Sequence, residues 1–437
     1  MESLVPAVLF TYLTLFKPHF TKPSFVYFSG YILSILITGG RKTMNHVAHT
    51  CFWVDRHLSS WERFLAEYRW DPTALLSTLL EALKAKLGQE LMVHGAFLAV
   101  VDTLLIAKNG RKMPGIQTWK DHSGNADRGE HLRGHHWALV GLVAFSPLWG
   151  RYLCLPLLMQ LISGQFNPYM FMVDPDGVAT LATFWDSVLP LIMQLHLLLN
   201  QAPLRVVADA YFGKASFIQP LLTAGIHVIT RLRHDAVGWD DPSPDQRSDA
   251  KRGRKWKLAQ LLDSLPAELV TVHLYGKLVT VKAVCREVWL RDISQKVKVV
   301  VVEGIKEPII LVSTDLSLTM VQIIEIFGAR FTIEIAIRDL KEYFGLAAYQ
   351  CYLHTAIHRF VHLACIAFCL YRLIQLKEDT RAWLPPVPKS ISPASFAHLR
   401  QGLQHFILGR ILSPQFGELP KSQDSPSELE AILHIVG

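Results

Sequence analysis

One stretch late in the chain carries a carboxylate between cations at helical spacing. Phe327, Arg330, Glu334, Arg338 and Lys341 recur at steps of three or four residues, so a helix would present them as one stripe. A carboxylate with a cation one turn away on each side suits a site that holds a divalent metal ion and a phosphate together. A solvated amphipathic helix crossed by ion pairs has the same pattern and is the alternative.

A second, apolar stripe runs along the same predicted helix. Ile326, Ile333, Ile337, Leu340 and Phe344 lie about 100° round from the charged stripe. One face is therefore expected to pack against the protein, while the other directs its charges towards a site or towards solvent.

Two aspartates are expected to reach the same place as Glu334. Asp102 follows the apolar run FLAVV and precedes TLLIA, and Asp209 follows LRVVA, so each should lie in or at the end of a buried strand. Buried aspartates need hydrogen-bond partners or metal ions. The three carboxylates are therefore the candidate catalytic and metal-binding residues.

This arrangement resembles the DDE transposases of bacterial insertion sequences. One branch of that family carries Y-x-x-R-x-x-x-E-x-x-x-x-x-x-K, and Phe327, Arg330, Glu334 and Lys341 stand at that spacing, with Phe in place of Tyr. The segments VVDTLLIAKNG and VVADAYFGKASF occur in the matching order. The resemblance implies an enzyme of DNA recombination, an endonuclease and strand transferase that moves a mobile element by cut-and-paste transposition.

The chemistry expected of the three carboxylates is metal-dependent phosphodiester cleavage. Two Mg²⁺ ions about 3.5–4 Å apart, for which Mn²⁺ can substitute, would supply an activated nucleophile and relieve charge on phosphorus. Asp102 is expected to bridge both ions, with Asp209 and Glu334 holding one each. By resemblance, Arg330 and Lys341 hold a phosphate of the non-transferred strand. Phe327 cannot donate the phenolic hydrogen bond of the family's Tyr, which leaves hairpin formation open or assigned to Tyr343.

The elements around these residues predict an α/β fold, α+β overall. Three strands from residue 95 onward, a helix and then alternating strands and helices give the β-β-β-α-β-α-β-α order of an RNase H-like core, which places the first strand beside the fourth. The predicted division begins with a helical N-terminal DNA-binding domain at 1–90. The core follows in two parts, 91–233 and 317–376, with an inserted β-rich subdomain at 234–316 between them, and residues 377–437 form a C-terminal tail suited to oligomerisation.

Basic segments outside the signature are candidate DNA contacts. Arg41 and Lys42 follow a Gly-Gly turn and open a predicted helix, although a helical cap on the core is the alternative. The segment RSDAKRGRKWK, residues 247–257, has six cations, and Trp256 within it could stack on an unpaired base. A solvated loop is the alternative there. The candidate contacts are Arg330, Arg338, Lys341, Arg252, Arg254, Lys255, Trp256, Arg41 and Lys42.

Two histidine groups are interpreted without a metal ion. His354, His358 and His362 repeat every four residues but have no accompanying carboxylate or cysteine, so packing explains them. His131, His135 and His136 resemble the family's polar loop before the second strand and are expected to position other groups.

Composition sets broad limits. The 437 residues include 44 Lys and Arg against 37 Asp and Glu, a net charge of +7, whose sign fits a DNA-binding protein. Six cysteines without a C-x-x-C pair indicate a reducing compartment. Apolar stretches at 23–40 and 152–173 are interrupted by Gly, Pro and polar residues, and no signal peptide is apparent.

The predicted protein is thus a transposase of the bacterial cytoplasm and nucleoid, with no membrane association. Its expected partners are double-stranded DNA, both element ends and target, and a second copy of the chain in the DNA complex. A domesticated or inactive DNA-binding protein that keeps the fold is the alternative, and a plain metal-dependent nuclease of the same fold is a third.

Overall fold

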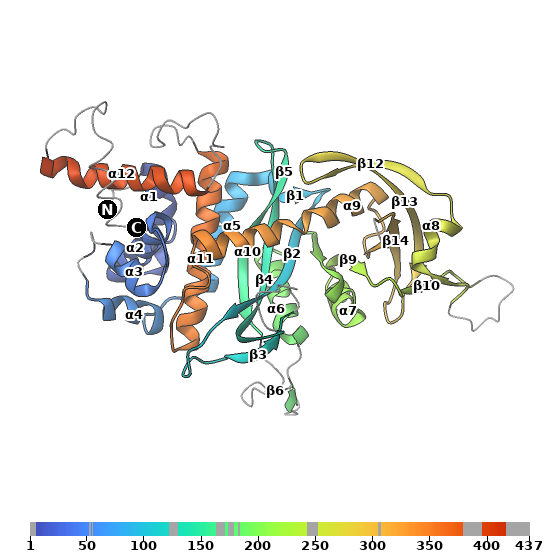
Figure 1. The fold of residues 1–437 in the computed structure, drawn as a ribbon, viewed down its shortest axis with the longest axis horizontal. Helices are drawn as coiled ribbons and strands as arrows, with labels where there is room; N and C mark the ends of the chain where they lie inside the picture. The colour runs from blue at the N-terminus through green and yellow to red at the C-terminus, as the bar shows by residue number, and fades with distance from the viewer. Residues whose placement is uncertain are drawn as a thin grey trace. The chain divides into compact units, whose positions relative to one another are not determined.

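The chain folds into two compact units in the computed structural model (Figure 1). The first unit takes Met1–Leu87, Ile106–His135 and Ile337–Gly437, and the second takes Gly88–Leu105 and His136–Ala336. The structure describes residues 6–51, 54, 56–121, 130–162, 171–173, 179–181, 184–242, 252–304, 307–378 and 396–416.

The first unit is mainly helical. Its N-terminal helices begin at capped positions, where the hydroxyls of Thr21 and Thr43 accept the backbone N–H of Ser24 and His46. A short strand, β3 (Gln117–Lys120), pairs antiparallel with the first residues of β4 (His131–Ser146). The helices are α1 (Ala7–Thr14), α2 (Lys22–Ile37), α3 (Met44–Thr50), α4 (Leu58–Ala66), α5 (Pro72–Leu87), α11 (His354–Lys377) and α12 (Phe396–Phe416), with the 3-10 turn η1 (Lys17–His19).

Helix α11 forms the core of this unit. Within the described residues it alone is long and apolar enough to cross a bilayer, and 94% of its most apolar window is buried inside the protein. The guanidinium of Arg359 on α11 donates to the carbonyls of Leu65 and Trp70, at 2.9 and 2.6 Å. A buried core helix passes the same test of length and hydropathy as a membrane span, so α11 is weak evidence for a membrane.

The second unit is built on a large mixed sheet. Strand β2 runs parallel to β8, with Val100 opposite Val207, and β8 runs parallel to β9. The prediction that the first long strand lies beside the fourth is therefore confirmed. Its elements up to β9 are η2 (Gly88–Leu91), β1 (Met92–Val93), β2 (Ala96–Ala107), β4, β5 (Arg151–Leu161), β6 (Phe171–Val173), β7 (Ala179–Leu181), α6 (Phe184–Leu198), β8 (Leu204–Ala208), η3 (Ala210–Phe212), α7 (Ala215–Thr223) and β9 (His227–Leu232).

The strands between residues 237 and 313 continue this sheet. Strand β15 pairs antiparallel with β9, so the order runs β11-β10-β13-β14-β15-β9-β8-β2-β4. The region predicted as an inserted subdomain is thus rich in strands and joined edge to edge to the core, while the five-part division itself stays a prediction. Its elements are β10 (Val237–Trp239), β11 (Lys255–Lys257), η4 (Leu258–Gln260), α8 (Leu261–Ser264), β12 (Glu268–Leu274), β13 (Lys277–Trp289), β14 (Lys296–Val302) and β15 (Ile309–Ser313).

The single helix predicted over the signature residues is wrong. Two helices, α9 (Met320–Ala329) and α10 (Thr332–Tyr343), meet at a turn formed by Arg330 and Phe331. The backbone N–H groups of these two residues donate to the carbonyls three residues before them, as in a 3-10 turn. The Thr332 hydroxyl donates to the Ala329 carbonyl at 2.7 Å. The apolar stripe survives the break. Ile326, Ile333, Leu340 and Phe344 are buried, and Ile337 is half-buried.

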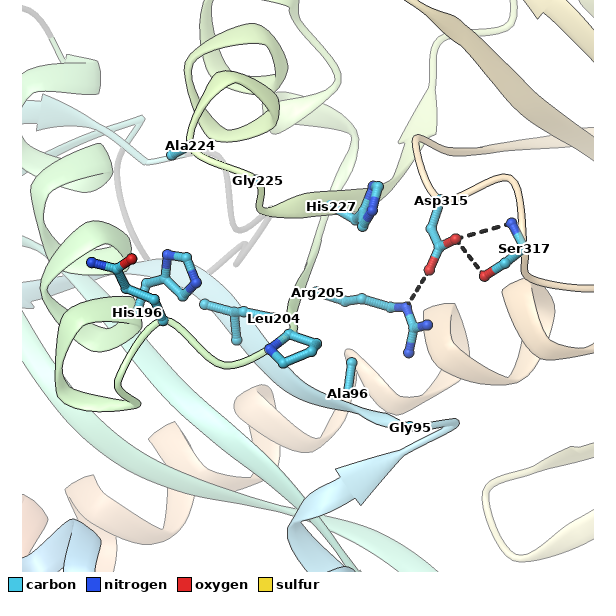
Figure 2. A pocket seen from close by; sticks show the side chains of 12 residues that line it. Gly95, Ala96, His196, Leu204, Arg205, Ala224, Gly225, His227, Asp315 and Ser317 are labelled. Atoms are coloured by element: carbon cyan, nitrogen blue, oxygen red, sulfur yellow. Dashed lines mark hydrogen bonds and ion pairs between the residues drawn. The ribbon is translucent and has the colours of Figure 1, made fainter.

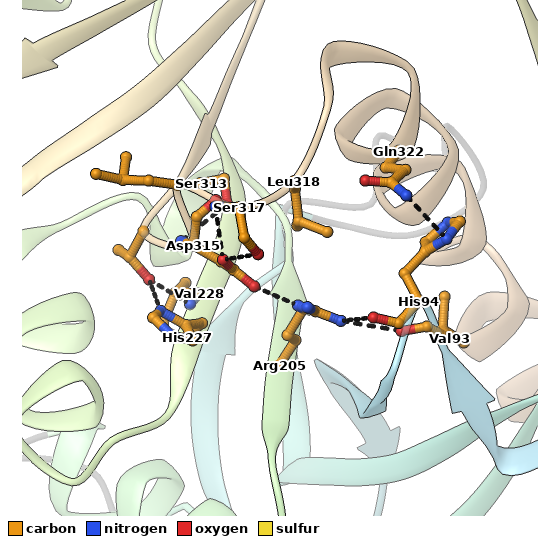
Figure 3. A network of polar contacts seen from close by, with 12 residues as sticks. Val93, His94, Arg205, His227, Val228, Ser313, Asp315, Ser317, Leu318 and Gln322 are labelled. Atoms are coloured by element: carbon orange, nitrogen blue, oxygen red, sulfur yellow. Dashed lines mark hydrogen bonds and ion pairs between the residues drawn. The ribbon is translucent and has the colours of Figure 1, made fainter.

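A buried ion pair fastens three parts of the second unit. Arg205 on β8 donates from Nε to Asp315 Oδ2 at 2.8 Å and from Nη1 to the carbonyls of Val93 and His94, at 2.9 and 3.1 Å (Figure 3). Burial raises the pKa of Asp315, but hydrogen bonds from Ser317 and Arg205 outweigh burial and hold that pKa below its ordinary value. Strand β8, the β1–β2 turn and the β15–α9 loop are thereby joined.

Removing one partner of this pair should destabilise the protein strongly. Arg205→Met leaves the Asp315 carboxylate buried without its cation, which typically costs about 3–5 kcal/mol. The measurement is the denaturation midpoint of the full chain in urea. Lys84→Met, which removes the exposed Lys84–Glu81 pair, is the matched control and should change stability by less than about 1 kcal/mol. Equal effects of the two substitutions would contradict the assigned role of Arg205.

Candidate active site

Two aspartates lie at the same level of the paired parallel strands. Asp102 is half-buried within β2, where its Oδ1 accepts the N–H of Thr103 at 2.7 Å. Asp209 directly follows β8, and continuing the register from Val100 opposite Val207 places Asp102 opposite Asp209. The strand pairing therefore brings together residues more than a hundred positions apart in the sequence.

The position of Asp209 is fixed by its own side chain and by the next strand. Its Oδ1 accepts the N–H of Tyr211 at 2.9 Å and caps the turn η3. The buried hydroxyl of Thr230 on β9 donates to the Asp209 carbonyl at 2.6 Å. Hydrogen bonds therefore hold both the carboxylate and the backbone carbonyl of Asp209, which fixes the residue at the end of β8.

Arg330 connects the third carboxylate to this pair. Glu334 lies in the first turn of α10, where the helix dipole favours negative charge. The Arg330 side chain is only 10% exposed; its Nη2 lies 2.8 Å from Glu334 Oε1 and its Nη1 3.7 Å from Asp102 Oδ2. A buried cation thus bridges Asp102 and Glu334.

The three carboxylates interact electrostatically. The pKa of Asp102 is raised to about 6, chiefly by burial and also by the negative charges of Asp209 and Glu334, while the N–H of Thr103 and the Arg330 guanidinium oppose the rise. The carboxylate of Asp102 therefore lies within reach of the charges of Asp209, Glu334 and Arg330.

The donor chemistry of this cluster fits a hard divalent cation. Carboxylate oxygens are the ligands that Mg²⁺ and Mn²⁺ prefer. The pKa of Asp102 is raised mainly by burial and in smaller part by the neighbouring carboxylates, and a bound cation would oppose both effects. In the arrangement observed, no three His, Cys, Asp or Glu side chains of the described ranges are close enough to hold one ion. Glu334 is instead paired with Arg330.

The cations predicted from the signature and the N-terminal region have different surroundings. On α10, Arg338 is 67% exposed and contacts Asp339, and Lys341 is exposed. Arg41 is exposed, but Lys42 is buried. Burial lowers the pKa of Lys42 to about 8, and its stem packs against Gly345. The prediction that Lys42 contacts DNA phosphate is therefore wrong, because the ammonium lies inside the protein.

Trp256 is also a buried residue. Its Nε1 donates to Asp240 Oδ2 at 2.7 Å, and the guanidinium carbons of Arg254 and Arg286 lie 4.0 and 4.7 Å from its ring centroid. The ring packs within the sheet and is 8% exposed, so the prediction that it stacks on an unpaired base is wrong.

The other cations of that basic segment differ from Trp256. Arg252, Arg254 and Lys255 are exposed, while residues 247–251 lie outside the described part of the chain. The exposed cations therefore keep the surface position that a DNA contact requires.

The histidines make ordinary packing and hydrogen-bonding contacts. The two ring nitrogens of His135 lie 2.8 Å from the Tyr349 hydroxyl and from the Pro114 carbonyl, and burial lowers its pKa to about 4. Burial likewise lowers the pKa of His358, to about 3, and His362 bonds to the His358 carbonyl at 2.7 Å. These rings are neutral at physiological pH.

Several neighbours of the carboxylates are not among the functional residues predicted from the sequence. Tyr275, in the turn between β12 and β13, is 65% exposed and its ring lies 5.4 Å from that of Phe331. Burial raises the pKa of Tyr275, Arg330 lowers it and Glu334 raises it. Tyr211 and Lys214 follow Asp209 within the segment VVADAYFGKASF. Their closeness in sequence to Asp209 is the signal by which they could have been predicted as site residues.

A pocket in the second unit lies at the opposite end of the parallel strands. It has a volume of about 510 Å³ and is lined by Ala96, Leu204 and His227, which begin β2, β8 and β9, together with Arg205 and Asp315 (Figure 2). The aspartates Asp102 and Asp209 lie towards the carboxyl ends of β2 and β8. The pocket is therefore separate from the carboxylate cluster.

Comparison with known families places much of the chain in a described family. The model of the family described as DDE superfamily endonuclease matches residues 16–295, more than half of the chain. The matched range contains Asp102 and Asp209 and ends before Glu334. No curated protein matches the chain.

The raised pKa of Asp102 predicts a pH-dependent stability. Because the pKa of the folded protein, about 6, exceeds the ordinary value of 3.8, stability falls as pH rises through this interval. In EDTA, Asp102→Asn should therefore stabilise the chain above pH 7 by roughly 2 to 3 kcal/mol. The gain should become small near pH 3.5, where the carboxyl is mostly protonated in both states. Urea midpoints across this pH range measure the effect, and a gain independent of pH would contradict the assigned pKa.

Proposed function

Because the chain belongs to the DDE superfamily of endonucleases, we propose that it is a DNA transposase that binds the ends of a mobile element and catalyses metal-dependent DNA cleavage and strand transfer. The observation that carries this proposal is the gathering of Asp102, Asp209 and Glu334 by the β2–β8 pairing and by Arg330. A catalytically inactive descendant would have no need of three mutually repelling carboxylates around a buried arginine.

The core that holds these residues is proposed to be RNase H-like. The order β2, β4, β5, α6, β8, α7, β9 and the parallel neighbours β2 and β8 support this assignment. The insertion-sequence branch is supported by the spacing of Arg330, Glu334 and Lys341. Endonucleases of this superfamily use divalent metal ions.

Asp102, Asp209 and Glu334 are the proposed ligands of two Mg²⁺ ions. When bound, such ions lower the pKa of the attacking water or 3′-hydroxyl and stabilise charge on phosphorus and on the leaving oxygen. Asp102, with a pKa of about 6, is ionised at neutral pH and available as a ligand. The chain's own contribution is to hold the carboxylates in register and to orient the DNA.

Arg330 is proposed to exchange partners as the reaction proceeds. Its Nε–H is buried and has no hydrogen-bond partner among the described residues. Release of Glu334 would free a further donor, and a phosphate oxygen of bound DNA is an acceptor of suitable charge. Phe327 lacks a hydroxyl, so any hairpin intermediate would depend on Tyr343 or on no phenol at all.

DNA is proposed to contact the exposed cations Arg338, Lys341, Arg252, Arg254, Lys255 and Arg41. Exposed side chains with positive charge bind phosphates by releasing counterions. Double-stranded element ends and target DNA in the bacterial nucleoid are the proposed partners, and two copies of the chain are proposed to act together because an element has two ends.

Conservative substitutions of the three carboxylates should abolish cleavage. Asp102→Asn, Asp209→Asn and Glu334→Gln should each lower Mg²⁺-dependent cleavage of element-end DNA more than about 100-fold, because each removes a ligand of a metal ion that would stabilise the transition state. The assay uses inverted repeats identified in the DNA that flanks the gene, with end binding measured in parallel. Asp292→Asn, at an exposed carboxylate, is the control. Full cleavage by any one of the three variants would exclude this triad.

Exposed cations of β11 and the preceding loop should contribute to the salt dependence of DNA binding. Arg252→Gln with Lys255→Gln should flatten the slope of log affinity against log salt by up to about 0.9 for each lost phosphate contact. Lys84→Gln serves as a control because Lys84 already pairs with Glu81. An unchanged slope would make these cations ordinary solvated side chains.

A further inference from the structure

A group of aromatic side chains stands beside Asp209. Tyr211, two residues after it, is 51% exposed, and its ring centroid lies 5.1 Å from that of Phe184 and 5.9 Å from that of Trp185. Phe184 and Trp185 are half-buried. We call Phe184, Trp185 and Tyr211 the aromatic shelf.

The shelf is held rigidly from below. Phe212 and Phe217 are buried under it, with ring centroids 5.0 Å apart. Gly213 has no room for a side chain, because a Cβ there would lie 2.6 Å from the Arg231 carbonyl oxygen. The loop after β8 is therefore pressed against β9, and Tyr211 is held outward by a backbone that cannot easily rearrange.

A cation accompanies the exposed ring. The exposed Lys214 places its Nζ 4.3 Å from the Tyr211 centroid and 5.7 Å from that of Trp185. An exposed ring with an ammonium beside it offers a stacking face and a phosphate contact within one nucleotide's reach. Neither group is needed to bury the core, since the buried phenylalanines already fill it.

We propose that the aromatic shelf binds an unpaired nucleobase of the DNA strand at Asp209, with Lys214 on the neighbouring phosphate. The proposal rests on the proposed function, because it takes DNA as the substrate at Asp209. The link is direct, since the Tyr211 N–H donates to the Asp209 carboxylate at 2.9 Å. A base on Tyr211 therefore has its backbone close to the carboxylates.

The test measures binding of a defined DNA probe in EDTA. The probe is a duplex with a short run of unpaired thymidines that contains one 2-aminopurine, and the same duplex fully paired is the comparison. Wild-type protein should quench the unpaired 2-aminopurine. Tyr211→Ala and Tyr211→Leu should bind the unpaired probe about 5- to 150-fold more weakly, as expected for one stacked base, while the paired duplex should be affected much less.

Matched variants separate stacking from folding. Tyr211→Phe keeps the ring and should bind and quench like wild type, whereas Tyr211→Leu keeps apolar bulk without a π face. Tyr352→Ala, at another exposed tyrosine, should have no effect. Lys214→Gln should reduce the salt slope on the unpaired probe by about 0.7, the value for one contact to single-stranded DNA.

Unchanged binding and quenching by Tyr211→Leu would overturn the proposal. Equal losses on paired and unpaired DNA would do so as well, because they would indicate a contact to duplex DNA or damage to the fold. Failure of the proposed function is a separate result, namely wild-type protein that does not cleave element-end DNA with Mg²⁺. A wild-type protein that cleaves, but whose probe binding ignores Tyr211, would overturn the shelf alone.

Discussion

The parallel pairing of β2 with β8 is the constraint on which the candidate site depends. Every residue of β8 is buried, so its register against β2 is fixed by packing on both faces. A slip of one residue would turn Asp102 to the opposite face of the sheet. The Arg205 network strengthens this register, because Arg205 on β8 donates to the carbonyls of Val93 and His94 just before β2 begins. The next parallel strand, β9, brings Thr230 under Asp209. Positioning of the two aspartates is thus a property of three neighbouring strands rather than of the loops around them.

Electrostatic repulsion among the carboxylates explains why a buried arginine lies in this place. Burying one carboxylate near two others would be costly without a cation, and the raised pKa of Asp102 is the remaining expression of that cost. Arg330 reduces this cost by pairing with both carboxylates: its Nη2 lies 2.8 Å from Glu334 Oε1, and its Nη1 lies 3.7 Å from Asp102 Oδ2. A guanidinium has a single charge spread over a plane, whereas a dication concentrates twice that charge. The same carboxylates that tolerate Arg330 are therefore expected to favour divalent ions, and in the proposed mechanism a metal ion would have to replace Arg330 at Glu334.

The juxtaposition of Asp102 and Asp209 could be predicted from sequence because apolar runs mark buried strands and a helix between them implies a parallel crossover. The burial of the second stripe around Ile333 and Leu340 could be predicted in the same way, from periodicity alone. Other features depend on partners remote in the chain. The break at Arg330 arises from local backbone hydrogen bonds that periodicity does not report. Lys42 is buried by packing against Gly345, and the strands between residues 237 and 313 join the sheet through the pairing of β15 with β9, where Leu311 lies opposite Arg231. No local pattern encodes these contacts.

Trp256 and Tyr211 show how burial decides the role of an aromatic ring beside cations. In sequence, Trp256 within a basic segment is the stronger candidate for stacking on a base. In the structure, its cations Arg254 and Arg286 lie over the ring, and Arg286 and the indole both bind Asp240. These polar contacts offset the burial of charged groups and leave the ring no face for a ligand. Tyr211 has one cation, an exposed ring and buried neighbours that need no further cover. Tyr211 therefore keeps an exposed ring face that a ligand could contact, whereas Trp256 does not.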